Sequence, residues 1–128
     1  MVAQVIRFGL VGIGATVIHL AIGLMLIHAG WSPLIANVVA FVFAFFVSFA
    51  GHFGYTFAGQ STDPASAFVR FIVVAVVGFS FNETVLAIML QFDVMEKATA
   101  FVLSTLAAAI ITFVLSRNWA FRTKRAQI

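Results

Sequence analysis

The strongest constraint on this chain is a set of four long apolar runs separated by short polar segments. Each run is close to the roughly 20 residues that a helix needs to cross a hydrocarbon core of about 30 Å. Because that core holds no water to satisfy backbone groups, each run is predicted to be a helix. The runs cover residues 5–27, 34–53, 71–92 and 98–116. The sequence therefore predicts an all-α integral membrane protein with four transmembrane helices in a single domain, residues 1–128.

Composition argues against a soluble fold. Hydrophobic residues make up 63% of the chain and charged residues 9%, whereas a soluble domain is about a quarter charged. A small soluble domain buries only about two thirds of its surface, so it could not hide this many apolar side chains. The chain has no cysteine, which excludes disulfides and thiol chemistry.

The basic residues predict the orientation of the helices. If the four helices alternate in direction, one side of the membrane receives only Lys97, together with Asp93 and Glu96. The other side receives Arg7, Arg70, Arg117, Arg122, Lys124 and Arg125. The positive-inside rule then places both termini in the cytoplasm. These charges follow a membrane boundary, so we expect contact with anionic lipid headgroups and no binding of nucleic acid.

Two halves of the chain repeat the same pattern at a shift of 64 residues. In each half, small or polar residues recur four apart and lead into an aromatic-ended stretch. The matched positions are Ala36, Ala40, Ala44, Ser48 and His52 in the first half and Ala100, Ser104, Ala108, Thr112 and Ser116 in the second. We interpret the chain as a duplicated two-helix unit, with repeat 1 at about 5–57, repeat 2 at about 68–121 and a polar loop over 58–66.

The first helix carries a stripe of small or polar residues on one face. Its members, spaced three or four apart, are Gly9, Gly12, Thr16, His19 and Gly23. Because small residues let helices approach closely in lipid, the stripe is predicted to be a helix–helix contact. After this helix, Ser32 is predicted to cap the second helix and Pro33 to lie in its first turn.

Three polar residues inside the predicted spans are candidates for a substrate path: His19, Asn82 and Glu83. Glu83 is the only acid well inside a span, where an ionised side chain costs about 2.5–3.5 kcal/mol, so it should face protein. It is either a structural group bonded to His19, Asn82 or a partner subunit, or a group that binds substrate hydroxyls or carries a proton. His19 is either a neutral, hydrogen-bonded residue or a proton carrier or ligand. Asn37 is interpreted as bonding only a neighbouring backbone.

A second set of candidates lies where the helices meet the cytoplasm. Arg7 and Arg70 open the first and third helices. His52, Arg117 and Asn118 close the second and fourth. Under two-fold repeat symmetry these groups converge on one vestibule, where an arginine fork suits a phosphate and an aromatic rim of Trp119 and Tyr55 suits an amphipathic ligand. The alternative is simple anchoring at the membrane interface.

Motifs for catalysis are missing from the sequence. There is no HExxH, no P-loop glycine run, no pair of carboxylates and no acidic cluster suited to a divalent metal. We therefore expect neither an enzyme nor a metal or organic cofactor.

Three motifs resemble those of the GtrA-like family of small four-span proteins, over nearly the whole chain. They are Arg7-Phe8-x-x-Val11-Gly12, Ser48-Phe49-x-Gly51-His52-x-x-Tyr55-Thr56-Phe57 and Thr112-Phe113-x-x-Ser116-Arg117-x-Trp119-x-Phe121. The family pattern is Asn-Phe-x-x-Asn-Arg-x-Trp-x-Phe. The first copy here has Phe53 at the arginine position, so the family arginine role is carried over only to Arg117.

This resemblance implies translocation of a polyprenyl-phosphate-linked sugar from the cytoplasmic to the outer leaflet of the bacterial inner membrane, for cell-envelope polysaccharide glycosylation. It also implies a glycosyltransferase partner that makes the lipid-linked sugar. Four short helices enclose little space, so we expect a homodimer, with the small-residue stripes as a packing surface. Two alternatives are a proton-coupled small multidrug-type exporter and a non-transporting membrane anchor for a glycosyltransferase.

Overall fold

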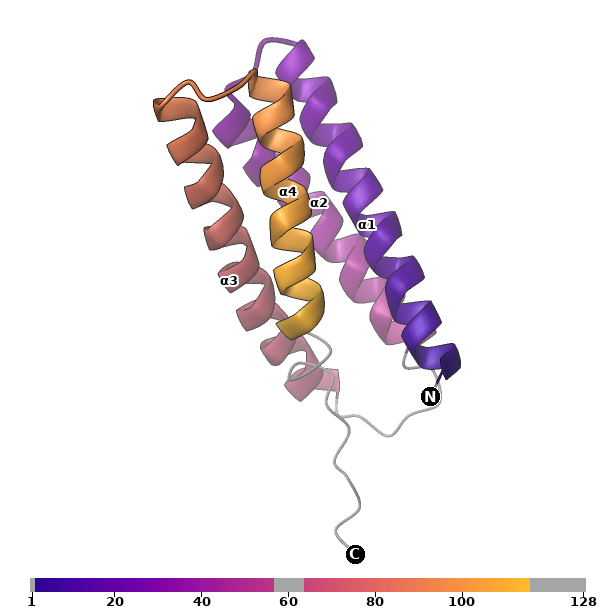
Figure 1. Ribbon diagram of the computed structural model, residues 1–128. Helices are drawn as coiled ribbons and strands as arrows, with labels where there is room; N and C mark the ends of the chain where they lie inside the picture. The colour runs from indigo at the N-terminus through magenta and orange to yellow at the C-terminus, as the bar shows by residue number, and fades with distance from the viewer. Residues whose placement is uncertain (1, 57–63, 116–128) are drawn as a thin grey trace, which may run out of the picture.

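The computed structural model describes residues 2–56 and 64–115 and shows an all-helical bundle (Figure 1). The described helices are α1 (Val2–His28), α2 (Pro33–Gly51), α3 (Pro64–Gln91) and α4 (Lys97–Leu115), and a short π-helix, η1 (His52–Thr56), continues α2. All four α-helices are long and apolar enough to cross a membrane. The predicted four-span, all-α fold is therefore confirmed.

Successive helices run in opposite directions, and both short connections lie at the same end of the bundle (Figure 1). We call this end, with residues 29–32 and 92–96, the loop end. At the opposite end, the N-terminal end, α1 and α3 begin and α2 and α4 end. Arg7 and Arg70 therefore lie toward one end and Lys97 at the other, as the sequence predicts. The cytoplasmic placement of the N-terminal end stays a prediction from the charge pattern.

The start of α3 differs from the prediction. The helix begins at Pro64, so residues 64–66 belong to it and not to the polar loop expected over 58–66. Proline is well suited to the first helical turn because its missing N–H would have no partner there. Arg70 consequently lies six residues inside α3 instead of opening it.

The turn between α1 and α2 follows the predicted chemistry in part. Pro33 is the first residue of α2, as expected, and Ser32 occupies the N-cap position. However, the Ser32 side chain makes no capping hydrogen bond, so that expectation is wrong. Gly30 has a φ of 99°, a left-handed conformation that glycine adopts without steric cost.

The bundle buries small side chains and exposes large apolar ones, as suits a protein surrounded by lipid. Ala36, Ala40 and Ala100 are fully buried, so the alanine stripes of α2 and α4 are the surfaces along which the helices pack. The most exposed large side chains include Ile13, Met25, Phe46, Phe92 and Ile110. Because the stripes face inward, they do not offer a surface for a second subunit.

Within residues 2–56 and 64–115, two apolar clusters hold the helices together, one at each end. The loop-end cluster is built on Leu86, Ala100 and Phe101, with Leu20, Leu24, Ile27, Leu34, Met89, Leu90, Met95 and Val102 packed around them. The N-terminal cluster is built on Phe71 and Val74, with Phe45, Phe49 and Phe113 around them. These clusters leave the middle of the bundle to smaller side chains.

Candidate functional site

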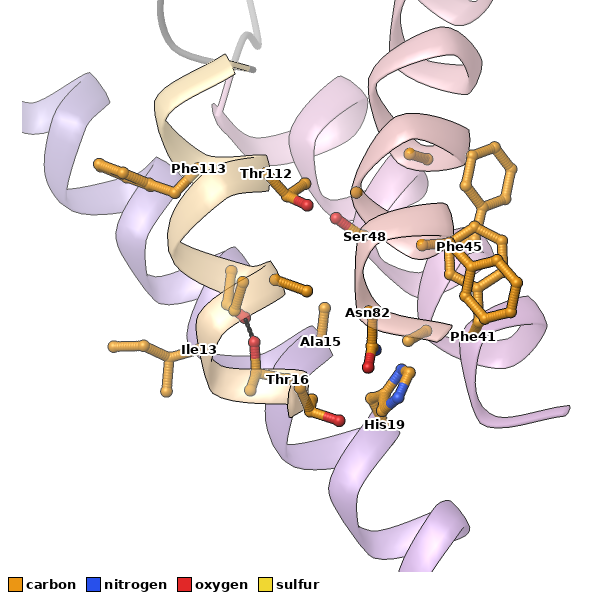
Figure 2. Close-up of a pocket in the computed structure, with 18 of the residues that line it drawn as sticks. Ile13, Ala15, Thr16, His19, Phe41, Phe45, Ser48, Asn82, Thr112 and Phe113 are labelled. Carbon is orange, nitrogen blue, oxygen red and sulfur yellow. Dashed lines mark hydrogen bonds between the residues drawn. The ribbon is translucent and has the colours of Figure 1, made fainter. Parts of the chain in front are cut away.

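A cavity of about 780 Å³ lies between the helices, and all four α-helices line it (Figure 2). Most of its lining is apolar, and many positions are alanine or glycine, among them Ala15, Ala44 and Gly12. Such small side chains leave open the space that larger ones would fill. Its volume is within the usual range for a small-molecule binding site, about 300–1,000 Å³.

The small-residue stripe of α1 lines this cavity along most of its length. Gly9, Gly12, Thr16 and His19 are all lining residues. A Cβ atom placed on Gly9 or Gly12 would meet nothing within 4 Å. The predicted helix–helix contact is therefore wrong at these two positions. It holds at Gly23, which packs against the ring of Phe101 on α4, and at His19, which contacts α2 and α4.

Polar side chains reach the cavity at two levels. Ser48, His52 and Thr112 line it toward the N-terminal end. His19, Asn82 and Thr105 line it toward the loop end. In Figure 2, Thr112 and Ser48 lie above Asn82 and His19. A ligand that spans the cavity would meet polar groups at both ends and apolar groups between them.

Asn37 is the centre of a buried hydrogen-bond network that joins three helices. Its Oδ1 lies 2.8 Å from His19 Nε2 and 3.3 Å from Asn82 Nδ2. Its Nδ2 donates to Glu83 Oε2 at 2.7 Å. The interpretation that Asn37 bonds only backbone is therefore wrong. Glu83 is bonded to protein, as expected, and reaches His19 only through Asn37.

The geometry of this network fixes the direction of each hydrogen bond. Asn37 turns its amide nitrogen toward Glu83, whose Oε2 accepts, and its oxygen toward the other two residues. His19 Nε2 and Asn82 Nδ2 are then both donors to that oxygen. The His19 ring also stacks on Phe101, with 5.5 Å between ring centroids. Glu83 itself does not line the cavity, and it is linked to the lining residues His19 and Asn82 through Asn37.

Two buried polar atoms at the loop-end level have no hydrogen-bond partner among the described residues. They are Asn82 Oδ1 and Thr105 Oγ1. Their side chains are only 3% and 5% exposed, and both line the cavity. Asn82 is among the polar residues that the sequence predicts for the substrate path, whereas Thr105 and the network around Asn37 are not predicted. A threonine inside an alanine-rich helix gives little signal, because its hydroxyl can bond its own backbone.

The candidates at the N-terminal end are only partly described. His52 is buried, lines the cavity and packs its ring edge-on against Phe71, with 6.0 Å between centroids. Arg7 is half-buried and Arg70 is exposed. The other predicted members, Arg117, Asn118, Trp119 and the side chain of Tyr55, lie outside what the structure describes. The convergence of these groups on one vestibule stays a prediction.

The cavity opens sideways between α1 and α4. Four of its lining residues are also strongly exposed, and all four come from these two helices. They are Ile13 and Val17 on α1, at 64% and 58% exposure, and Leu106 and Ile110 on α4, at 43% and 66%. We call this seam the lateral opening. Because its edges are apolar, a hydrocarbon chain could pass it without losing contact with lipid.

Comparison with known proteins gives one family. The family model described as GtrA/DPMS, transmembrane domain, matches residues 7–121. No curated protein and no solved structure shows a significant match. This family points to a role in glycosyl-lipid translocation or a related sugar-carrier function, in a transmembrane flippase type of protein. Because the match covers most of the sequence, this multi-pass membrane protein belongs to the GtrA/DPMS transmembrane-domain family.

Proposed function

We propose that this protein translocates a polyprenyl-phosphate-linked sugar from the cytoplasmic to the outer leaflet of the bacterial inner membrane, for glycosylation of cell-envelope polysaccharide. The observation that supports this most is an intramembrane cavity with polar groups at both ends and an apolar lateral opening. Such a lipid combines a polar headgroup, which hydrocarbon excludes, with a chain that is soluble in hydrocarbon.

The cavity matches the headgroup and the lateral opening matches the chain. A hydroxyl moved from water to an apolar phase without a partner costs about 4–8 kcal/mol, so polar lining at two depths would lower the barrier to crossing. The chain can stay in lipid between Ile13 of α1 and Ile110 of α4 while the headgroup crosses inside the bundle. The protein thus needs to shelter only the polar part.

The phosphate is proposed to enter at the N-terminal end, which the charge pattern assigns to the cytoplasm. Arg7, Arg70 and Arg117 would hold it, because the guanidinium fork matches phosphate oxygens. His52 and Asn118 would assist them, with Trp119 and Tyr55 as an aromatic rim. A glycosyltransferase would deliver the lipid from the same side. In a homodimer, the subunits would pack through exposed apolar faces such as that of Phe46, because the alanine stripes are buried.

A vesicle assay tests the function directly. The protein is reconstituted in liposomes that contain polyprenyl-phosphate glucose, and periodate, which does not cross the bilayer, is added outside to oxidise accessible sugar. Empty vesicles should lose only the outer-leaflet fraction, whereas vesicles with protein should lose nearly all of it. Replacing Arg7, Arg70 and Arg117 together by glutamine should slow this loss at least tenfold. An unchanged rate would contradict the phosphate role, and no loss beyond that of empty vesicles would contradict the function.

Filling the cavity should block transport without unfolding the protein. Ala15 lines the cavity and points into it (Figure 2), so Ala15→Leu would occupy space that the headgroup needs. We expect translocation to fall at least tenfold, with an unfolding temperature close to that of the wild type. Ala21→Leu makes the same change at an exposed position of the same helix. It should leave the translocation rate and the unfolding temperature unchanged. Equal rates in the two variants would exclude the cavity as the path.

A further inference from the structure

At the loop-end level of the cavity lie two oxygen atoms, at the same depth, that have no hydrogen-bond partner within the described part of the chain. Asn82 lies nine residues before the end of α3, and Thr105 lies eight residues after the start of α4. At 1.5 Å per residue, both are about 12–14 Å from the loop end of their helices. Both side chains are more than nine-tenths buried and line the cavity. Leaving a buried polar atom unpaired costs about 1–3 kcal/mol, so two together in one cavity point to a ligand.

The network behind Asn82 determines what kind of ligand this can be. Glu83 accepts from Asn37, and Asn37 Oδ1 in turn accepts from Asn82 Nδ2. Turning the Asn82 amide over would place two oxygen atoms face to face, so its Oδ1 remains the atom without a partner. This oxygen can only accept a hydrogen bond. The group that meets it must therefore be a donor.

This requirement separates the two polar parts of a glycosyl phosphate lipid. The phosphodiester carries acceptor oxygens and no donor at neutral pH, so it would meet Asn82 Oδ1 with repulsion. A sugar hydroxyl both donates and accepts, so it can satisfy Asn82 Oδ1 and can pair in either direction with the Thr105 hydroxyl. Among the parts of such a lipid, only the sugar fits this level of the cavity.

We propose that Asn82 and Thr105 form a hydrogen-bonding subsite for sugar hydroxyls, so that the sugar lies toward the loop end of the cavity and the phosphate toward the N-terminal end. This assignment rests on the proposed function. It gives Glu83 and Asn37 a role as positioning residues, because they hold the Asn82 amide with its oxygen free. It also predicts that the sugar-bearing lipid binds more tightly than the bare polyprenyl phosphate.

The test measures binding of two probes, polyprenyl-phosphate glucose and polyprenyl phosphate, by native mass spectrometry of the purified protein. Thr105→Val removes one hydroxyl with little change of shape. It should weaken binding of the glucose lipid about five- to tenfold, the value of one hydrogen bond, and leave the bare lipid unaffected. Asn82→Leu should weaken binding of the glucose lipid at least as much as Thr105→Val does. Thr99→Val, the same change at an exposed position of α4, should alter neither affinity.

The unfolding temperatures of the variants show whether weaker binding comes from a lost hydrogen bond or from unfolding of the protein. Because Thr105 Oγ1 has no partner among the described residues, Thr105→Val should unfold at or above the wild-type temperature. The subsite is overturned if the wild type binds the two lipids equally, or if Thr105→Val and Asn82→Leu both keep the preference for glucose. If either result is found and the wild type still translocates the glucose lipid in the periodate assay, the sugar subsite is wrong but the proposed function stands. If the wild type translocates no lipid, the proposed function is wrong.

Discussion

Replacing Asn37 by leucine is expected to destabilise the folded bundle by about 2–4 kcal/mol, more than any other single polar substitution in the described residues. The side chain is fully buried and bonds three residues from two other helices. A hydrogen bond between membrane helices is worth only about 0.6 kcal/mol on average. Most of the expected loss therefore comes from the polar groups that remain without a partner, above all the carboxylate of Glu83.

A double substitution separates these contributions. If the unpaired carboxylate dominates, adding Glu83→Leu to Asn37→Leu should recover part of the lost stability, in a double-mutant cycle measured by unfolding in mixed micelles. Val38→Leu, at the neighbouring exposed position of α2, serves as the control and should be neutral. Wild-type stability in Asn37→Leu would show that the network contributes nothing to the fold.

The sequence allowed the helices and their packing faces to be predicted because both depend on local pattern. Length and apolarity determine the four spans, and small or polar residues four apart define a continuous stripe on α2 and on α4. The buried positions Ala36, Ala40 and Ala100 belong to these stripes. The role of Asn37 could not be predicted, because its partners come from α1 and α3 and their meeting depends on how far each helix is shifted along its axis.

The stripe of α1 shows the limit of periodicity. A pattern of small residues identifies one face of a helix but does not say what lies against it. Gly23 meets Phe101, whereas Gly9 and Gly12 face the cavity. The difference comes from the opposite helices, which place a large ring near the loop end and small side chains such as Ala108 further along. Only the three-dimensional arrangement distinguishes a contact from a space.

The shift of 64 residues suggests why the site is asymmetric. At this shift Asn37 of the first half corresponds to Phe101 of the second. Both meet His19, one by a hydrogen bond and the other by ring stacking. If the halves are duplicates, the two copies of this position have diverged, and one is now polar and the other aromatic. The histidine is then held by a polar group and an apolar one, which fix its ring at the loop-end level of the cavity.

Because Gly23 contacts Phe101, two glycine-to-alanine substitutions on α1 are expected to change stability in opposite directions. In Gly23→Ala the new methyl group would overlap the Phe101 ring. That ring is fully buried in the loop-end cluster and stacked on His19, so it cannot turn aside without displacing the histidine. Overpacking of this kind costs about 1–3 kcal/mol, and the displaced His19 should also lower translocation.

The control for this prediction is Gly14→Ala. Gly14 is exposed, and a methyl group there would meet nothing within 4 Å. Alanine stabilises a helix by about 0.5–1 kcal/mol relative to glycine, so this variant should unfold at or above the wild-type temperature. The double variant Gly23→Ala/Phe101→Leu, in which a smaller side chain replaces the ring, should recover part of the lost stability because the clash is removed. Equal unfolding temperatures for Gly23→Ala and Gly14→Ala would mean that α1 and α4 do not approach each other as closely at this point as the contact of Gly23 with Phe101 requires.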